Sequence, residues 1–227
     1  MGALAFYGLA IISLLITLGA QAFISSSYSK YSKVKNQKGY TGEEIARKIL
    51  DKHGLKDIKV EETSGYLSDH YDPNKRVIRL STSIFKESSV ASVAVACHEC
   101  GHAIQDKEGY VFLRIRSTMV PFVNLCTYAG YLAIIIGGIM SALGLIWAGI
   151  IAEMVILLFQ VITLPVEFNA SKRGLNEVKQ EQFLTSSEYS GGKTMLTSAA
   201  LTYVASVATS IIQILRLVLM YGGNNRR

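Results

Sequence analysis

The sequence feature that most constrains the fold is an uncharged apolar run near the amino terminus, from Ala3 to Ile24. A helix of this length measures about 33 Å at about 1.5 Å per residue, which is enough to cross the hydrocarbon core of a bilayer. A cleaved signal peptide would carry basic residues before the apolar run and small residues after it. Here nothing basic precedes the run, and lysines follow it at positions 30, 33, 35 and 38. The run therefore predicts a retained transmembrane anchor.

Two further apolar blocks, Val120 to Ile139 and Leu143 to Val166, are separated by only a few residues and predict a transmembrane hairpin with a tight turn. Basic residues flank the anchor and the hairpin on what would be one side of the membrane. They are Lys30, Lys33, Lys35, Lys38, Arg114, Arg116, Lys172 and Arg173. Because basic flanks stay on the cytoplasmic side, residues 25–118 are expected to be cytoplasmic. We therefore attribute the net charge of +6 to orientation in the membrane and to contact with anionic lipid, and not to the binding of nucleic acid.

The last apolar block, Lys193 to Met220, carries a polar residue every three or four positions, which places a polar stripe on one helical face. Its length favours a fourth span, whereas Arg226 and Arg227 beyond it favour a helix that lies along the membrane surface. Glu153 is the only carboxylate within an apparent span. Because a charge inside a bilayer is normally paired, we expect Glu153 to pair with Arg216 of the last block.

Residues 25–118 resemble an ordinary water-soluble sequence. Thr41 precedes Glu44 by three positions, the spacing of a capping box, and predicts a helix that ends near Gly54. The alternation of apolar and polar residues predicts three short strands in a small antiparallel sheet. These strands are Ile58 to Glu62, Leu67 to Tyr71 and Val77 to Leu80.

The chemistry is carried by the segment His98-Glu99-Cys100-Gly101-His102, on a helix that Ser88 or Ser89 can cap. Histidines four positions apart share one helical face, so both imidazoles can reach one metal ion. Glu99 lies about 100° round the helix from His98, where it can touch a metal-bound water rather than the metal. Zinc suits this pattern, and Glu99 would take the proton of that water during attack on a peptide carbonyl. Gly101 would leave room close to the metal.

A catalytic zinc needs a third protein ligand, and two residues are candidates. Glu167 follows the third apolar block and carries a suitable charge, and His70 in the second predicted strand is the alternative. Cys97 and Cys100 flank the first histidine, but the chain lacks a second cysteine pair of this kind, which disfavours a cysteine zinc site or a redox motif.

The segment Ala96 to Gln105 resembles a bacterial membrane family of neutral zinc metallopeptidases, the YugP-like group. Three further segments resemble this family in the same order, so the likeness runs nearly end to end. They are Asp69 to Pro73, Leu164 to Ser171 and Ala199 to Ala205. More distantly, the chain is similar to the HtpX-type and CAAX-prenyl-protease families, in which a later helix supplies a glutamate ligand and, four residues on, an aspartate that supports a histidine ligand. This similarity implies Glu167 as the third ligand, but Ser171 and nearby Asn169 offer no carboxylate partner for His102.

Together these features imply a mainly α, α+β protein with a small zincin-like (gluzincin-like) domain on a bundle of three or four transmembrane helices. The expected divisions are an anchor at 1–24, a cytoplasmic zincin-like domain at 25–118, a transmembrane hairpin at 119–166, a third-ligand helix and loop at 167–192, and a transmembrane or interfacial helix at 193–221. The implied location is the plasma membrane of a prokaryote, crossed several times, with the catalytic domain in the cytoplasm.

The expected function is that of a zinc endopeptidase, with His98, His102 and Glu167 as metal ligands and Glu99 as the base. Its partners would be protein or peptide substrates, membrane proteins among them, and the lipid bilayer. A peptide could add to the predicted strand Leu67 to Tyr71, and His70 or Tyr71 would then be placed to stabilise the oxyanion. A protease that cleaves within the membrane is one alternative, and a non-catalytic scaffold stabilised by zinc is another. Charged residues at the end of the motif helix disfavour the first, and Glu99 disfavours the second.

Overall fold

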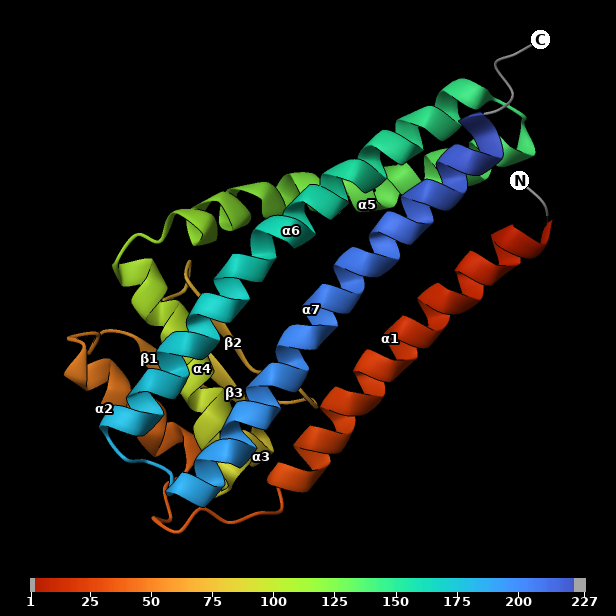
Figure 1. Ribbon diagram of the computed structural model, residues 1–227. Coiled ribbons are helices and arrows are strands. Elements are labelled where there is room, and N and C mark those ends of the chain that lie inside the picture. Colours follow the sequence, from red (N-terminus) through yellow and green to blue (C-terminus); the bar gives the residue numbers. More distant parts are fainter. Residues whose placement is uncertain (1–2, 223–227) are drawn as a thin grey trace. The chain divides into compact units, whose positions relative to one another are not determined.

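The computed structural model describes residues 3–222. Figure 1 shows a mainly helical chain with one small sheet, which confirms the predicted mainly α, α+β class. The described chain divides into two compact units. The first unit comprises the residues up to Gln21, Arg114–Leu164 and the residues from Leu201 onward, and the second comprises Ala22–Leu113 and Pro165–Ala200.

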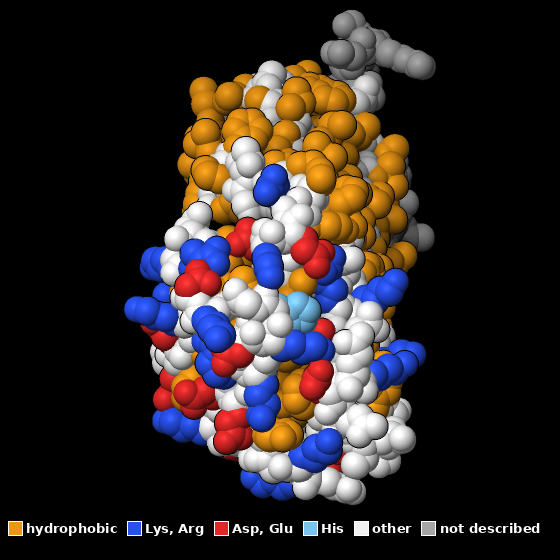
Figure 2. Space-filling model, turned by 90° about the vertical axis from the view of Figure 1, so that its left-hand side faces the viewer, with side chains coloured by type: hydrophobic (Ala, Val, Ile, Leu, Met, Phe, Trp, Pro, Cys, Tyr) orange, Lys and Arg blue, Asp and Glu red, His pale blue; other side chains and the backbone are white. Residues whose placement is uncertain are grey.

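Four helices of the described chain are long and apolar enough to cross a membrane. They are α1 (Ala3–Tyr31), α5 (Val111–Ile139), α6 (Leu143–Gln180) and α7 (Ser186–Tyr221). All four extend beyond the predicted apolar blocks, because a helix that has already formed adds further residues at little cost. In Figure 2, hydrophobic side chains cover part of the surface with few charges among them, and charged side chains crowd another part. This distribution is typical of a membrane protein with a water-exposed portion.

Within the first unit, α5 and α6 form the predicted hairpin and approach each other at glycines. A Cβ atom built at Gly149 would lie 2.4 Å from Cγ1 of Ile134, and one built at Gly137 would lie 2.9 Å from the backbone nitrogen of Ile146. Ile146 also packs with Leu217 of α7 in a small buried cluster. Such close approach of helices is a usual source of stability inside membranes, where burial of apolar surface gains little.

Arg216 of α7 does not form the expected ion pair. Its guanidinium carbon lies 4.3 Å from the ring centroid of Phe6 on α1, and it donates a hydrogen bond of 3.2 Å to Gln213. The expected pair with Glu153 was therefore wrong for the described residues, because the face of the Phe6 ring and the amide already receive the cation. Arg226 and Arg227, which favoured a helix on the membrane surface, lie outside the described residues.

In the second unit, the end of α1 is followed by α2 (Gly42–Lys52). Thr41 and Glu44 form the predicted capping box, in which each side chain accepts a hydrogen bond from the backbone N–H of the other residue. The apolar face of the helix is completely buried. It consists of Ile45, Ala46, Ile49 and Leu50. The helix ends before Gly54, whose φ of 68° requires the left-handed conformation that glycine adopts without strain.

A three-stranded sheet packs in the same unit, with the order β1 (Lys59–Thr63), β3 (Val77–Ser81), β2 (His70–Asp72). β3 lies in the centre because four of its five residues are buried. The pair β2–β3 is antiparallel as predicted, but β1 pairs with β3 in parallel, so the expected wholly antiparallel sheet was wrong. β2 also begins later than predicted, because Leu67 has a φ of 54°, which an extended strand cannot contain.

The helix α4 (Val90–Lys107) follows the short helix α3 (Thr82–Lys86) and forms the buried centre of the second unit. Ser89 caps it, and the Ser89 side chain accepts a hydrogen bond from the N–H of Ser92. Every residue from Val90 to Gln105 except His98 is buried. A helix that is buried on all sides can hold polar side chains only where they have partners, which directs attention to its histidines.

Candidate metal centre

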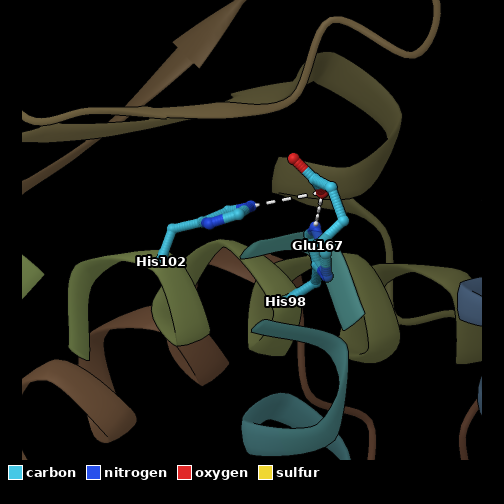
Figure 3. A group of neighbouring side chains, drawn as sticks. All are labelled: His98, His102 and Glu167. Atoms are coloured by element: carbon cyan, nitrogen blue, oxygen red, sulfur yellow. Dashed lines mark ion pairs between the residues drawn. The ribbon is translucent and has the colours of Figure 1, made fainter. Parts of the chain in front are cut away.

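Two histidines of α4 and one glutamate of α6 converge on a point in the second unit (Figure 3). One carboxylate oxygen of Glu167 lies 3.3 Å from Nε2 of His98 and 3.5 Å from Nε2 of His102. The three ligand atoms all lie within 4.8 Å of one another, and no second group of this kind occurs among residues 3–222. The structure therefore brings together the three residues that we predicted as metal ligands.

Close packing between α4 and α6 places Glu167 opposite the histidines. A Cβ atom at Gly101 would lie 2.4 Å from the carbonyl oxygen of Ala170, and one at Gly174 would lie 2.8 Å from the carbonyl oxygen of Cys97. Only glycine permits these approaches of one backbone to another. We expected Gly101 to leave room close to the metal, but the backbone of α6 occupies the space beside it.

The imidazole nitrogens that face away from Glu167 also have partners. Nδ1 of His98 lies 3.1 Å from Oγ of Ser171, and Nδ1 of His102 lies 3.0 Å from Oε1 of Gln105. A hydrogen bond at Nδ1 orients the ring and leaves Nε2 to bind a metal. Ser171, at the position of the aspartate in the distantly similar families, thus supports His98 and not His102.

Glu99 lies on the same helix but outside the metal group. Its side chain is only 6% exposed. Burial raises the pKa of Glu99 to about 7. The charge of His98 and a hydrogen bond from the backbone of Tyr71 act to lower this pKa, whereas the carboxylates of Glu167 and Asp69 raise it further. A carboxyl group with a pKa near neutrality can both take and return a proton at physiological pH.

The strand β2 is fastened to α4 through Tyr71, whose hydroxyl donates a hydrogen bond of 2.8 Å to Asp106. Because side chains alternate along a strand, the neighbouring His70 points to the opposite face of the sheet. There its Nδ1 lies 2.8 Å from the carbonyl oxygen of Ser68 and its Nε2 lies 3.4 Å from the guanidinium of Arg79. The structure does not bring His70 to the metal group, where it was the alternative ligand and a candidate to stabilise the oxyanion.

Cys97 and Cys100 belong to the apolar core of the second unit. Both are fully buried, and Sγ of Cys100 lies 3.7 Å from the carbonyl oxygen of Ala46. Burial raises the pKa of both thiols well above the usual range. A thiol binds metals as the thiolate, so we assign these two residues to packing.

The donor set fits zinc. Two imidazole nitrogens and one carboxylate oxygen are ligand types that zinc accepts, and three protein ligands leave one position open. The partners at both Nδ1 atoms turn the Nε2 atoms toward Glu167, which is the arrangement that a metal between them requires. A cation at this point would also compensate the buried carboxylate of Glu167.

Gln105 is the residue of this site that sequence reasoning missed. It is fully buried and follows His102 by three positions on α4. Residues three apart on a helix are neighbours on its surface, so the spacing was a usable signal.

The fold and the site together define a class: a chain whose described residues include four helices long and apolar enough to cross a membrane, with two histidines and a glutamate on two helices placed to hold a metal ion. The sequence model of the family described as "Putative neutral zinc metallopeptidase" matches residues 6–222, and the chain belongs to this family. The chain is also similar to the "Putative membrane protease YugP" of Bacillus subtilis (strain 168). The two are 42% identical over 216 residues, which cover 95% of this chain and 96% of that protein. The predicted resemblance is thus confirmed, and the comparison with solved structures found no match.

Proposed function

We propose that this protein is a membrane-anchored zinc endopeptidase in which Glu99 is the general base. One observation carries the proposal: a carboxylate oxygen of Glu167 faces Nε2 of both histidines, while Glu99 is buried beside them with a pKa of about 7. Membership of a zinc metallopeptidase family supports the same function. The name of the Bacillus relative, a membrane protease, supports it as well.

In this mechanism, His98, His102 and Glu167 hold zinc, which when bound supplies a Lewis acid for the peptide carbonyl and lowers the pKa of water. Glu99 accepts a proton from the attacking water and returns it to the leaving amine. Its raised pKa makes both transfers accessible near neutral pH. The hydrogen bond from the backbone of Tyr71 orients the Glu99 carboxylate for this exchange.

The free edge of β2 is the surface that we propose for the substrate. Among residues 3–222, β2 pairs only with β3, so its other edge can accept a further strand. β2 itself lies against α4, where the Tyr71 backbone donates a hydrogen bond to Glu99 and the Tyr71 hydroxyl donates one to Asp106. A peptide added here as a strand would lie beside Glu99. The substrate class is therefore an extended segment of a protein or peptide, such as an unfolded part of a membrane protein.

We further propose the membrane orientation and the segment divisions that the sequence predicted. The basic residues that flank the apolar helices support a cytoplasmic second unit, because such residues stay on the cytoplasmic side. The bacterial relative supports a prokaryotic plasma membrane.

The experiment that tests the function is casein or peptide cleavage by purified protein in detergent, together with metal analysis. The substitution Glu99→Gln should abolish cleavage while zinc stays bound, and a chelator should abolish cleavage by the wild type. Glu87→Gln is a matched control, because Glu87 is an exposed carboxylate just before α4. Loss of zinc together with activity in Glu99→Gln would mean that Glu99 binds the metal or holds the fold, and the mechanism would be wrong.

The same experiment separates a peptidase from a non-catalytic scaffold, and the structure disfavours the second alternative, cleavage within the membrane. A non-catalytic scaffold would bind zinc in the wild type and cleave nothing. A protease that cleaves within the membrane requires its motif helix in a span, and α4 is not among the four candidate spans of the described chain.

A further inference from the structure

Gln105 lies at the junction of α4 and α6 and is fully buried. Its Oε1 lies 3.0 Å from Nδ1 of His102. Its Nε2 donates two hydrogen bonds to α6, one of 2.8 Å to the carbonyl oxygen of Val166 and one of 2.9 Å to Oδ1 of Asn169. One side chain thus contacts a proposed ligand directly and also the residue that precedes another proposed ligand, Glu167.

The partners determine the direction of these hydrogen bonds. The carbonyl oxygen of Val166 can only accept, so the Gln105 atom beside it is the amide nitrogen and the atom beside His102 is the oxygen. An amide oxygen can only accept as well, so Nδ1 of His102 must carry a proton. In the neutral imidazole the lone pair is then on Nε2, the atom that faces Glu167. Gln105 therefore selects the tautomer that a metal ligand needs.

Arg173 anchors the far end of this chain of hydrogen bonds. Its Nε donates a hydrogen bond of 2.7 Å to Oδ1 of Asn169, and its guanidinium lies 2.7 Å from the carboxylate of Glu108 at the end of α4. Arginine can only donate, so the Asn169 atom at this contact is the oxygen, which also accepts from Gln105. A chain of hydrogen bonds thus joins Glu108 to His102 and crosses between α4 and α6 twice, and Oδ1 of Asn169 accepts from both of its neighbours.

We propose that Gln105 is the positioning residue of the metal centre. It holds His102 in the tautomer that binds through Nε2, and it holds the turn of α6 that carries Glu167. Because the group that contacts His102 is the neutral amide of Gln105, it orients the imidazole without adding a negative charge to the site. The inference rests on the metal site of the proposed function but does not require proteolysis.

The test uses Gln105→Met, which keeps the approximate size of the side chain and removes both hydrogen-bonding groups. The full chain in detergent is measured for zinc affinity, by competition with a chelating dye, and for the visible absorption spectrum of Co²⁺ bound in place of zinc. Zinc affinity should fall about 10- to 100-fold, the usual effect of losing a partner of a metal ligand. The cobalt spectrum should change because the orientation of His102 changes.

Ser92→Ala is the matched control for a general loss of stability. Ser92 is also a fully buried polar residue of α4, but its partner is Ser89 at the start of the helix. This variant should lower the melting temperature and leave both metal readouts unchanged. If zinc affinity falls as far in Ser92→Ala as in Gln105→Met, Gln105 has only a structural role and the inference is wrong.

Asn169 provides a second pair of variants that decides the question if Gln105→Met does not fold. Asn169→Asp keeps an oxygen that accepts from both Gln105 and Arg173, so zinc affinity should stay near the wild-type value. Asn169→Leu removes that oxygen, and affinity should fall about tenfold. Unchanged affinity in Gln105→Met or in Asn169→Leu, or equal losses in the two Asn169 variants, would overturn the inference. A wild type that binds zinc and cleaves no peptide would refute the proposed function alone, whereas a wild type that binds no zinc would refute both.

Discussion

The substitution Gly101→Ala tests how the metal centre is assembled. The added methyl group would lie 2.4 Å from the carbonyl oxygen of Ala170, and two further backbone atoms of Ala170 would lie at 3.0 and 3.1 Å. No side chain can rotate to relieve this contact, so α6 must retreat by about 1 Å to reach the 3.4 Å at which ordinary contact begins. Glu167 lies one helical turn before Ala170 and would move with it.

The expected effect on stability is small and the effect on the metal is large. Alanine favours a helix over glycine by about 1 kcal/mol, whereas an extra methyl group in a filled space costs about 1–3 kcal/mol. The free energy of unfolding should therefore fall by at most about 2 kcal/mol. Metal–ligand distances tolerate errors of only about 0.2 Å, so the displacement of Glu167 should weaken zinc binding about tenfold or more.

The assay is zinc competition together with thermal melting in detergent, with and without chelator. Gly174→Ala should behave like Gly101→Ala, because its methyl group would lie 2.8 Å from the carbonyl oxygen of Cys97 and 3.0 Å from the backbone nitrogen of His98. Gly144→Ala is the control, since nothing lies within 4 Å of its Cβ position. Wild-type zinc affinity in Gly101→Ala would refute the reasoning. An effect in Gly101→Ala but not in Gly174→Ala would instead support a role for Gly101 beside the metal itself.

Three further predictions follow from the site and the orientation. Glu167→Ala should weaken zinc binding about as severely as His102→Ala, whereas His70→Ala should leave the zinc content unchanged. Metal analysis of the purified variants checks this prediction. Zinc retained in Glu167→Ala would mean that the third ligand is another residue. Burial raises the pKa of Glu99 to about 7, so the folded metal-free protein keeps a proton that the unfolded chain loses near about pH 4.3. The free energy of unfolding should therefore fall by about 4 kcal/mol in total as the pH rises through this window. Melting with chelator at about pH 5 and about pH 8 should show most of this fall in the wild type, and an equal fall in Glu99→Gln would contradict the prediction. A cysteine placed at the exposed Lys56, in a background without the native cysteines, should resist an impermeant thiol reagent in intact cells; labelling before lysis would invert the proposed topology.

Much of the local structure was predictable, because its causes lie within a few residues of one another. Thr41 and Glu44 form their capping box through contacts three positions apart, and Ser89 caps α4 in the same way. His98 and His102 share a face because a helix repeats every 3.6 residues. The apolar blocks needed only length and composition to predict membrane-crossing helices. Glu167 was favoured over His70 by its charge and its place after the third apolar block, and the resemblance to known families agreed.

The tertiary structure decided whatever depends on two segments meeting. The sequence shows Gly101 as a helix glycine within the histidine motif, and the approach of Ala170 to 2.4 Å of its Cβ position could not be read from it. Gln105 was visible as a polar residue three positions after His102, but its three partners include two on α6. The parallel pairing of β1 with β3 and the contact of Arg216 with the Phe6 ring likewise depend on two segments meeting. The physical reason is that local propensities act along the chain, whereas partners are selected by close packing between elements that are far apart in sequence.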